Sequence, residues 1–125
     1  MRRRAAIARA VVTGPPLLLY DSPTAGLDPI TAHTIMALII KERDLANTTT
    51  LIVTHRYQDG LLMANFRYNP DSGQLVPARE NGHRPQRRTK FIVMKEGTLV
   101  FEGSEAELEA VQDPYISKFR KQGGG

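Results

Sequence analysis

Two polar residues that could bind a ligand or take part in catalysis lie at the ends of short apolar runs. Asp21 follows residues 17–20, and His55 follows the run at 49–54. In α/β sheets, ligands bind beyond the carboxyl ends of the strands. A carboxylate there can hold Mg²⁺ through water, and the ion neutralises the β- and γ-phosphates of a nucleotide. The alternatives are an acidic turn residue for Asp21 and a satisfied structural histidine for His55.

The flanking sequence predicts the elements that would position these residues. The apolar run at 17–20 predicts a strand buried on both faces, and the β-branched run at 49–54 predicts a second buried strand. Between them, Asp28 and Pro29 predict a helix start, as N-cap and first helical residue. That helix should run to about Asp44. Strand, helix and strand in this order predict a crossover unit of an α/β sheet.

Other elements are expected on both sides of this unit. Alanine and arginine, both strong helix formers, predict a helix at residues 2–12. Beyond His55, apolar runs alternate with turn residues, which predicts two hairpins among short helices. The expected positions are a helix at 57–65, a hairpin at 66–76, a polar surface loop at 77–90, a hairpin at 91–101, a helix capped by Ser104 with Glu107, and a last helix from Asp113 to about Gln122.

Composition limits the classes of function. The chain has 125 residues, 41% of them hydrophobic, which suffices for one modest domain. It has no cysteine, which excludes disulfides and thiolate metal sites. We expect neither a membrane span nor a signal peptide, because no apolar run reaches about 18 residues. The net charge of +4 is clustered at residues 2–9, 79–90 and 118–121, which indicates solvated faces or an anionic partner such as nucleic acid.

The string at residues 17–29 resembles a known family. Its sequence, Leu-Leu-Leu-Tyr-Asp-Ser-Pro-Thr-Ala-Gly-Leu-Asp-Pro, resembles the Walker B strand and D-loop of ABC-transporter ATPases, where Asp-Glu-Pro-Thr leads to Gly-Leu-Asp. His55 follows one helix and one strand later, where the family has its switch histidine. Residues 2–10 resemble the helix after the family's signature, and residues 91–108 its closing hairpin and helix. The resemblance omits about 66–90 and is closest to the Mla-like lipid and organic-solvent-resistance branch.

The resemblance implies an α/β fold, a partial P-loop NTPase with mainly parallel core strands, a C-terminal β-hairpin and short helices. It implies ATP and Mg²⁺ as ligands. Asp21 would order the water shell of Mg²⁺, and Asp28 would lie at a dimer interface and couple two nucleotide sites. His55 would hydrogen-bond the γ-phosphate and sense its loss, which suits a neutral imidazole that can both donate and accept.

The resemblance also implies partners and a location. The partners are a transmembrane permease subunit and a second ATPase subunit, in a homo- or heterodimer, with no specific nucleic acid. The location is cytoplasmic, peripheral at the inner face of the cell membrane. The chain would comprise the second half of the ATPase core at 1–65, a hairpin and basic insertion at 66–90, and the closing hairpin with C-terminal helices at 91–125.

Two features depart from the family pattern. The sequence contains no Gly-x-x-x-x-Gly-Lys-[Ser/Thr] phosphate loop. We therefore expect either a reading frame that starts late, at an internal Met, or a truncated natural chain. Ser22 stands at the position of the family's catalytic Glu, and serine is a poor proton acceptor near pH 7. Losing a general base costs about 10² to 10⁴ in rate, so we expect even a full-length version to turn ATP over slowly. Because the phosphate loop is missing as well, we expect no ATPase activity from this chain alone.

Three hypotheses for function follow. The first is the C-terminal part of an ABC transporter's nucleotide-binding subunit, which couples ATP binding and hydrolysis to transport. The second is a non-catalytic degenerate-site or regulatory fragment of such a transporter, which Ser22 and the missing phosphate loop favour. The third, a basic nucleic-acid-binding module, rests only on the arginine clusters. Ser22 itself is compatible with a degenerate site in an asymmetric dimer, with slow turnover supported by His55, or with a decaying gene.

Overall fold

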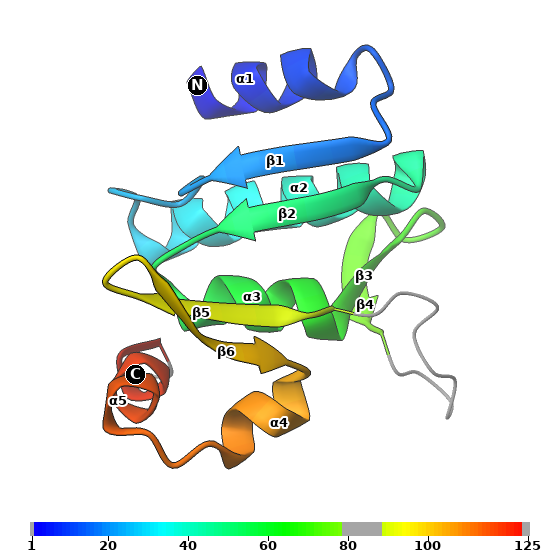
Figure 1. Cartoon of the computed structure of the whole chain (residues 1–125). Coiled ribbons are helices and arrows are strands. Elements are labelled where there is room, and N and C mark those ends of the chain that lie inside the picture. The colour runs from blue at the N-terminus through cyan, green and yellow to red at the C-terminus, as the bar shows by residue number, and fades with distance from the viewer. Residues whose placement is uncertain (1, 79–88, 124–125) are drawn as a thin grey trace. The chain divides into compact units, whose positions relative to one another are not determined.

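The computed structural model describes residues 2–78 and 89–123, and its architecture there is mixed α/β (Figure 1). Most of the polar loop expected at 77–90 lies outside the described residues. In chain order the elements are α1 Arg2–Val11, β1 Leu17–Asp21, α2 Pro29–Ala46, β2 Thr49–Val53, α3 Tyr57–Asn65, β3 Phe66–Asn69, β4 Gln74–Pro77, β5 Phe91–Lys95, β6 Thr98–Gly103, α4 Glu105–Ala110 and α5 Pro114–Gly123. These match the elements predicted from the sequence, with small shifts at their ends.

The chain divides into two compact units. The first comprises residues 1–55 with 66–77, and the second comprises 56–65 with 78–125. The β3–β4 hairpin therefore groups with the first unit, although α3 precedes it in sequence and belongs to the second. From the sequence we divided the chain at residues 65 and 90 into segments of the ABC ATPase family. That division stays a prediction.

The first unit is built on the parallel pair β1 and β2, joined through α2 as predicted. Leu17 lies opposite Thr49, and Asp21 lies opposite Val53. The Ser22 N–H donates to the Val53 carbonyl at 2.7 Å, which extends the pairing one residue past β1. Figure 1 shows the two strands side by side and running in the same direction. Both strands therefore end at one edge of the sheet.

The core of the first unit lies along α2. Ile35, Met36, Ile39 and Ile40 are fully buried, and their spacing places them on one helical face. The other buried apolar side chains of this unit include Ala32 of α2, Ile7 of α1, and Leu18 and Tyr20 of β1. Since these groups come from two helices and a strand, burying this face of α2 fixes β1 in place.

The predictions of a first strand buried on both faces and of a second buried strand are wrong for the described residues. Exposure alternates along β1, where Leu17 and Leu19 are 57% and 64% exposed and alternate with two buried residues. In β2, Leu51 and Val53 are 48% and 49% exposed. The cause is that the pair forms a two-stranded sheet with an apolar helix on one side only. Continuous apolar runs do not by themselves reveal how many faces of a strand are covered.

The end of α2 differs slightly from expectation. The helix continues to Ala46, and Asn47 adopts the left-handed conformation with φ of 54°. Its N–H donates to the carbonyl of Arg43, which satisfies one of the free carbonyls of the last turn. Asparagine is, after glycine, the residue that most readily takes this conformation. The helix thus ends at a C-cap that the sequence analysis did not identify.

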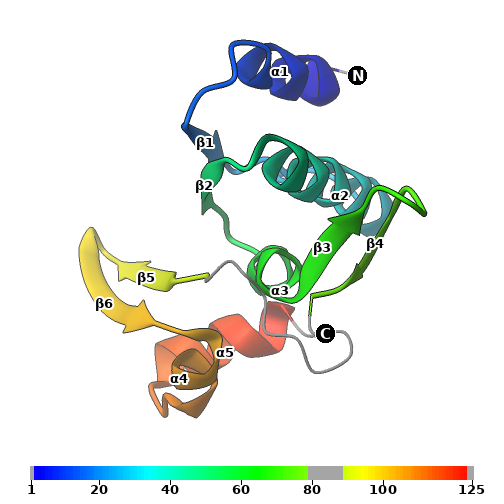
Figure 2. The same ribbon diagram turned by 90° about the vertical axis from the view of Figure 1, so that its right-hand side faces the viewer.

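The last turns of α2 also anchor the β3–β4 hairpin, which Figure 2 shows beside that helix. Arg43 and Asp44 form an ion pair at 2.8 Å. Arg43 donates to the Phe66 carbonyl at 2.9 Å, and Asp44 accepts from the Tyr68 N–H at 2.8 Å. The two side chains therefore satisfy backbone groups of β3 that face away from its partner β4. Such charge-assisted bonds are stronger than neutral ones.

We predict that Asp44→Ala lowers the free energy of unfolding by about 1–3 kcal/mol. The substitution removes the ion-pair acceptor of the nearly buried Arg43 guanidinium and the acceptor of the Tyr68 N–H, and the loss of such charge-assisted bonds carries that cost. Urea denaturation measures the change. The matched control is Asp71→Ala, an exposed carboxylate of the hairpin turn, which should shift stability by less than about 0.5 kcal/mol. Equal effects of the two variants would contradict the anchor.

The second unit packs around Tyr57, Leu108 and Ile116, with partly buried apolar residues from its other elements against them. Tyr57 meets Phe119 edge to face, with ring centroids 6.5 Å apart. The capping box of Ser104 with Glu107 is present as predicted. The β5–β6 hairpin turns at Glu96 and Gly97, both at positive φ, as tight two-residue hairpins require.

Arg120 ties the two short C-terminal helices together. Its guanidinium donates to the carbonyls of Leu108, Glu109 and Val111 at 2.7, 2.6 and 2.9 Å. They lie at the end of α4, where carbonyls lack partners from a following turn, and the Leu108 carbonyl also accepts from the Val111 N–H. A cation at this position also interacts favourably with the helix dipole.

We predict that Gly60→Ala destabilises the second unit, although alanine is normally favoured over glycine in a helix by about 1 kcal/mol. A Cβ at Gly60 would lie 2.6 Å from Cε1 of the Phe91 ring. Thermal denaturation should show a lower midpoint for the variant. Adding Phe91→Leu to Gly60→Ala should recover part of the loss, and a higher midpoint for the single variant would contradict the close approach.

None of the helices in the described ranges combines the length and the apolar character that crossing a bilayer requires.

Candidate functional site

Asp21 is the last residue of β1, and its side chain is exposed. The Ser22 hydroxyl donates to Oδ1 of Asp21 at 3.3 Å. Ser22 has φ of 48°, in the left-handed region that residues with a Cβ rarely adopt. Such a conformation costs about 1–3 kcal/mol and persists only where surrounding contacts impose it. Here the bond from the Ser22 N–H to Val53 is one such contact.

The loop from Ser22 to Asp28 is held by its own backbone and by one long side chain. The Ala25 N–H donates to the Ser22 carbonyl, and the Leu27 N–H donates to the Thr24 carbonyl, both at 3.2 Å. Thr24 is 2% exposed. The Arg3 guanidinium donates to the Ala25 carbonyl at 2.5 Å. The loop is therefore a closed series of turns attached to α1.

Arg3 was predicted from the sequence only as part of a basic cluster, and its bond to the loop was not predicted. Arg3 and Ala25 are 22 residues apart, and nothing local in the sequence pairs an arginine with a distant carbonyl. Only the packing of α1 beside the rest of the first unit brings the two groups together.

Asp28 is the N-cap of α2, as its position before Pro29 predicted. Its carboxylate accepts from the Thr31 N–H at 3.3 Å, and its carbonyl accepts from Ala32. The pKa of Asp28 is lowered below its ordinary value, most by a hydrogen bond from the Thr31 side chain and next by one from the Thr31 backbone N–H. The capping function of Asp28 is thus local. Its place at a dimer interface stays a prediction.

His55 lies just beyond β2, two residues after Val53, the partner of Asp21 in the strand register. The side chains of Asp21 and His55 are both exposed. The structure therefore brings Asp21, Ser22 and His55 to the same edge of the parallel pair. Asp28 lies apart from them along the chain, at the start of α2. The grouping of the first three follows from parallel pairing alone, because carboxyl ends of parallel strands share an edge.

The donor set at this edge suits Mg²⁺ held together with a ligand. Within residues 2–78 and 89–123 there is no group of three or more His, Asp or Glu side chains that could hold a metal ion. Mg²⁺ in nucleotide sites keeps several waters and uses one or two carboxylates with the phosphates of the substrate. Asp21, a single exposed carboxylate, fits that arrangement and does not form a cage of its own.

The sequence of the chain is similar to those of several ATP-binding proteins. The chain is 38% identical over 68 residues, 54% of its length, to the intermembrane phospholipid transport system ATP-binding protein MlaF of Haemophilus influenzae. It is 34% identical over 116 residues, 91% of its length, to the phosphonates import ATP-binding protein PhnC of Halobacterium salinarum. It is also 34% identical over 121 residues to PhnC 1 of Haloquadratum walsbyi, covering 93% of the chain.

By sequence, the chain is similar to ATP-binding subunits of ABC transporters. The matches support the ABC ATPase family expected from residues 17–29, and they extend to more than nine-tenths of the chain. The matched regions are 26%, 33% and 31% of the three relatives, so the chain spans about a quarter to a third of their length. Models of protein families give no match.

We predict that Asp28→Ala lowers the thermal midpoint near pH 7 and that this difference shrinks below about pH 4. The folded-state pKa of Asp28 is lowered, so its stabilising contribution is complete above the unfolded-state pKa and is lost as pH falls through the folded-state value. Asp28→Asn should retain most of the capping without this pH dependence, because asparagine caps as well as aspartate. A penalty for Asp28→Ala that stays constant down to pH 2.5 would contradict the assignment.

Proposed function

We propose that the chain is the C-terminal part of the nucleotide-binding subunit of an ABC transporter. The proposal rests on one observation above all. Asp21, Ser22 and His55 lie at the shared edge of a parallel β1–β2 pair, and the chain around them is similar to ATP-binding subunits. In α/β folds this edge is where ligands bind.

In this proposal Asp21 holds the water shell of Mg²⁺ at the end of β1. Bound with ATP, Mg²⁺ would neutralise charge on the β- and γ-phosphates. The imidazole of His55 donates a hydrogen bond to the γ-phosphate and responds to its loss. Asp28 couples two such sites across a dimer. Its N-cap position orients the carboxylate at the start of α2, next to the loop that Arg3 holds.

Ser22 limits catalysis at this site. A carboxylate base would polarise the attacking water, whereas a serine hydroxyl near pH 7 does not accept its proton. The Ser22 hydroxyl instead donates to Asp21. A complete subunit with this sequence should therefore bind ATP and turn it over slowly.

The partners in this proposal are a transmembrane permease subunit and a second ATPase subunit, with the chain at the inner face of the cell membrane. Within the family we favour the Mla-like branch, because the match to MlaF has the higher identity, 38% against 34%. That match covers fewer residues than the matches to PhnC. The cargo would then be a lipid.

The first test is the nucleotide sequence upstream of residue 1. The proposal expects an in-frame Gly-x-x-x-x-Gly-Lys-[Ser/Thr] loop followed by a Ser-Gly-Gly signature. An upstream sequence with neither, together with its own start signal at Met1, would count against an active transporter subunit.

With a complete subunit, Ser22→Glu is the informative variant. We predict that it raises the ATP turnover rate by about 10²- to 10⁴-fold, because it restores a general base beside Asp21. Phosphate release at saturating ATP and Mg²⁺ measures the change. Adding Asp21→Asn or His55→Ala to Ser22→Glu should remove the gain, whereas adding Asp71→Asn, on the hairpin turn, should not.

The same experiment addresses the second candidate function, a non-catalytic degenerate site. The identity of Ser22 is the specific observation that favours it. If Ser22→Glu leaves turnover unchanged while ATP still binds in the presence of Mg²⁺, the site is non-catalytic for reasons beyond Ser22. If the complete subunit binds no ATP, the nucleotide-binding function is wrong, and a regulatory or interaction role is the one that remains.

A further inference from the structure

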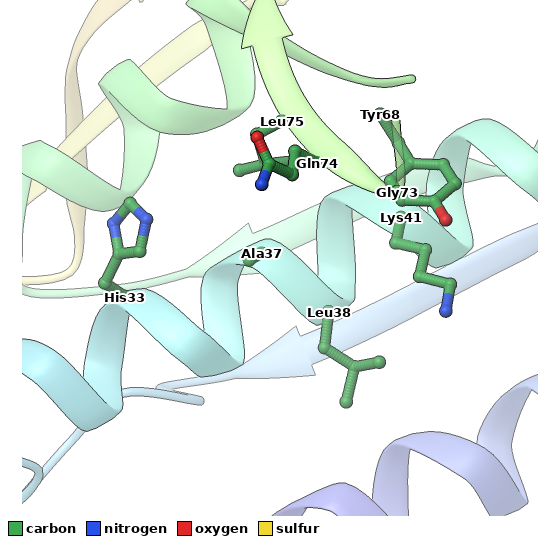
Figure 3. Close-up of a pocket in the computed structure, with 8 residues that line it drawn as sticks. All are labelled: His33, Ala37, Leu38, Lys41, Tyr68, Gly73, Gln74 and Leu75. Carbon is green, nitrogen blue, oxygen red and sulfur yellow. The ribbon is translucent and has the colours of Figure 1, made fainter. Parts of the chain in front are cut away.

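A concave site lies in the first unit, between α2 and the β3–β4 hairpin. The pocket has a volume of about 400 Å³. Figure 3 shows the residues that line it. They are His33, Ala37, Leu38 and Lys41 of α2, Tyr68 of β3, Gly73 of the turn, and Gln74 and Leu75 of β4. None of them belongs to the Asp21 edge.

The helical side of the pocket follows from spacing. His33, Ala37 and Lys41 are four residues apart, so they lie in a row along one face of α2. The small side chain of Ala37 leaves space between the two nitrogen-bearing residues. Figure 3 shows His33 and Lys41 at opposite ends of this row, with Gln74 across from it. The pocket is therefore lined by apolar side chains around Ala37 and by polar groups at His33, Lys41 and Gln74.

The hairpin side is held in place by contacts already described. The Tyr68 N–H is bonded to Asp44, which attaches the strand to the end of α2. The Lys41 ammonium lies 5.5 Å from the centroid of the Tyr68 ring, within the range of a cation–π interaction. Gly73, at φ of 70°, forms the turn beside the Tyr68 hydroxyl. The hairpin is thus fixed against α2 by groups that border the pocket.

The charge of the lining determines what the pocket can hold. None of its eight residues is acidic, and it offers a cation at Lys41, an imidazole at His33, an amide at Gln74 and a phenol at Tyr68. In the part of the chain that the structure describes, Lys41 contacts the Tyr68 ring but has no carboxylate partner. These groups favour an anion, and the apolar side chains around Ala37 favour a short hydrocarbon body attached to it.

We propose that this pocket binds a small organic anion, a phosphate monoester or carboxylate on a short apolar body, with Lys41 as the charge partner. The oxyanion takes hydrogen bonds from Lys41 and from the polar groups beside it. The apolar body lies on Ala37, Leu38 and Leu75. The site is independent of the nucleotide chemistry proposed for Asp21 and His55.

The test is a ¹H–¹⁵N NMR titration of the full chain with phenyl phosphate, phenylacetate, inorganic phosphate and the neutral analogue benzyl alcohol. Both aromatic anions should shift backbone signals of residues 33–41 and 68–75, with Kd on the order of 1 mM, as expected for ligands of about ten heavy atoms. Inorganic phosphate and benzyl alcohol should each bind at least about tenfold more weakly. Equal shifts with benzyl alcohol would overturn the role of charge.

Two variants test whether the Lys41 ammonium is the charge partner of the bound anion. Lys41→Met should weaken phenyl phosphate binding by about tenfold or more, since a charge-assisted hydrogen bond is lost. Lys118→Met, at an exposed residue of α5, removes the same charge and should leave Kd unchanged. Unchanged binding by Lys41→Met, or an equal loss in both variants, overturns the proposal.

Gln74→Leu provides a second variant at an exposed position, and it should weaken binding without changing the fold. The ¹H–¹⁵N spectra of Gln74→Leu and Lys41→Met without ligand show whether each variant is folded. A loss of binding that comes from unfolding is recognised in this way. Shifts confined to residues outside 33–41 and 68–75 place the anion elsewhere and reject the pocket. Because ATP is absent from every titration, these outcomes do not depend on the proposed transporter function.

Discussion

The parallel pairing of β1 with β2, backed by the buried face of α2, is the constraint on which the candidate site depends. The register places Asp21 opposite Val53, so the first residue past β1 and the second past β2 emerge at one edge. A shift of one residue would exchange the faces of the strand, exposing Leu18 and Tyr20 and burying Leu17 and Leu19. The burial of Leu18 and Tyr20 in the core of the first unit therefore determines which side chains reach the candidate site, as well as how the strand packs.

The loop after β1 shows how local strain is maintained. Ser22 adopts a left-handed backbone, and Gly26 does so at no steric cost. Asp28 then caps α2, so the loop ends where the helix begins. Between these points the Arg3 guanidinium holds the Ala25 carbonyl. The loop is shaped by β1 at one end, by α2 at the other and by α1 beside it. These contacts hold its side chains in fixed directions.

The hairpin of β3 and β4 adds a second feature to the same unit. It pairs with no other strand among the described residues, and side chains of α2 take up the exposed backbone groups of β3. A short edge strand satisfied in this way presents fewer free hydrogen-bonding groups to other chains. The same attachment creates the wall of the pocket that Lys41 and Tyr68 border. One ion pair thus both anchors the hairpin and shapes a concave surface.

The sequence by itself determined the order and type of the elements, the N-cap at Asp28, the capping box at Ser104 and the positions of Asp21, Ser22 and His55. These depend on local propensity, hydrogen bonds within a few residues and a contiguous family pattern. Tertiary structure decided the rest. Which faces of β1 and β2 are covered, where Arg3 and the Arg43–Asp44 pair bind, and which residues enclose the pocket depend on groups 22 or more residues apart. Such contacts form only when elements pack, and periodicity along the chain does not encode their partners.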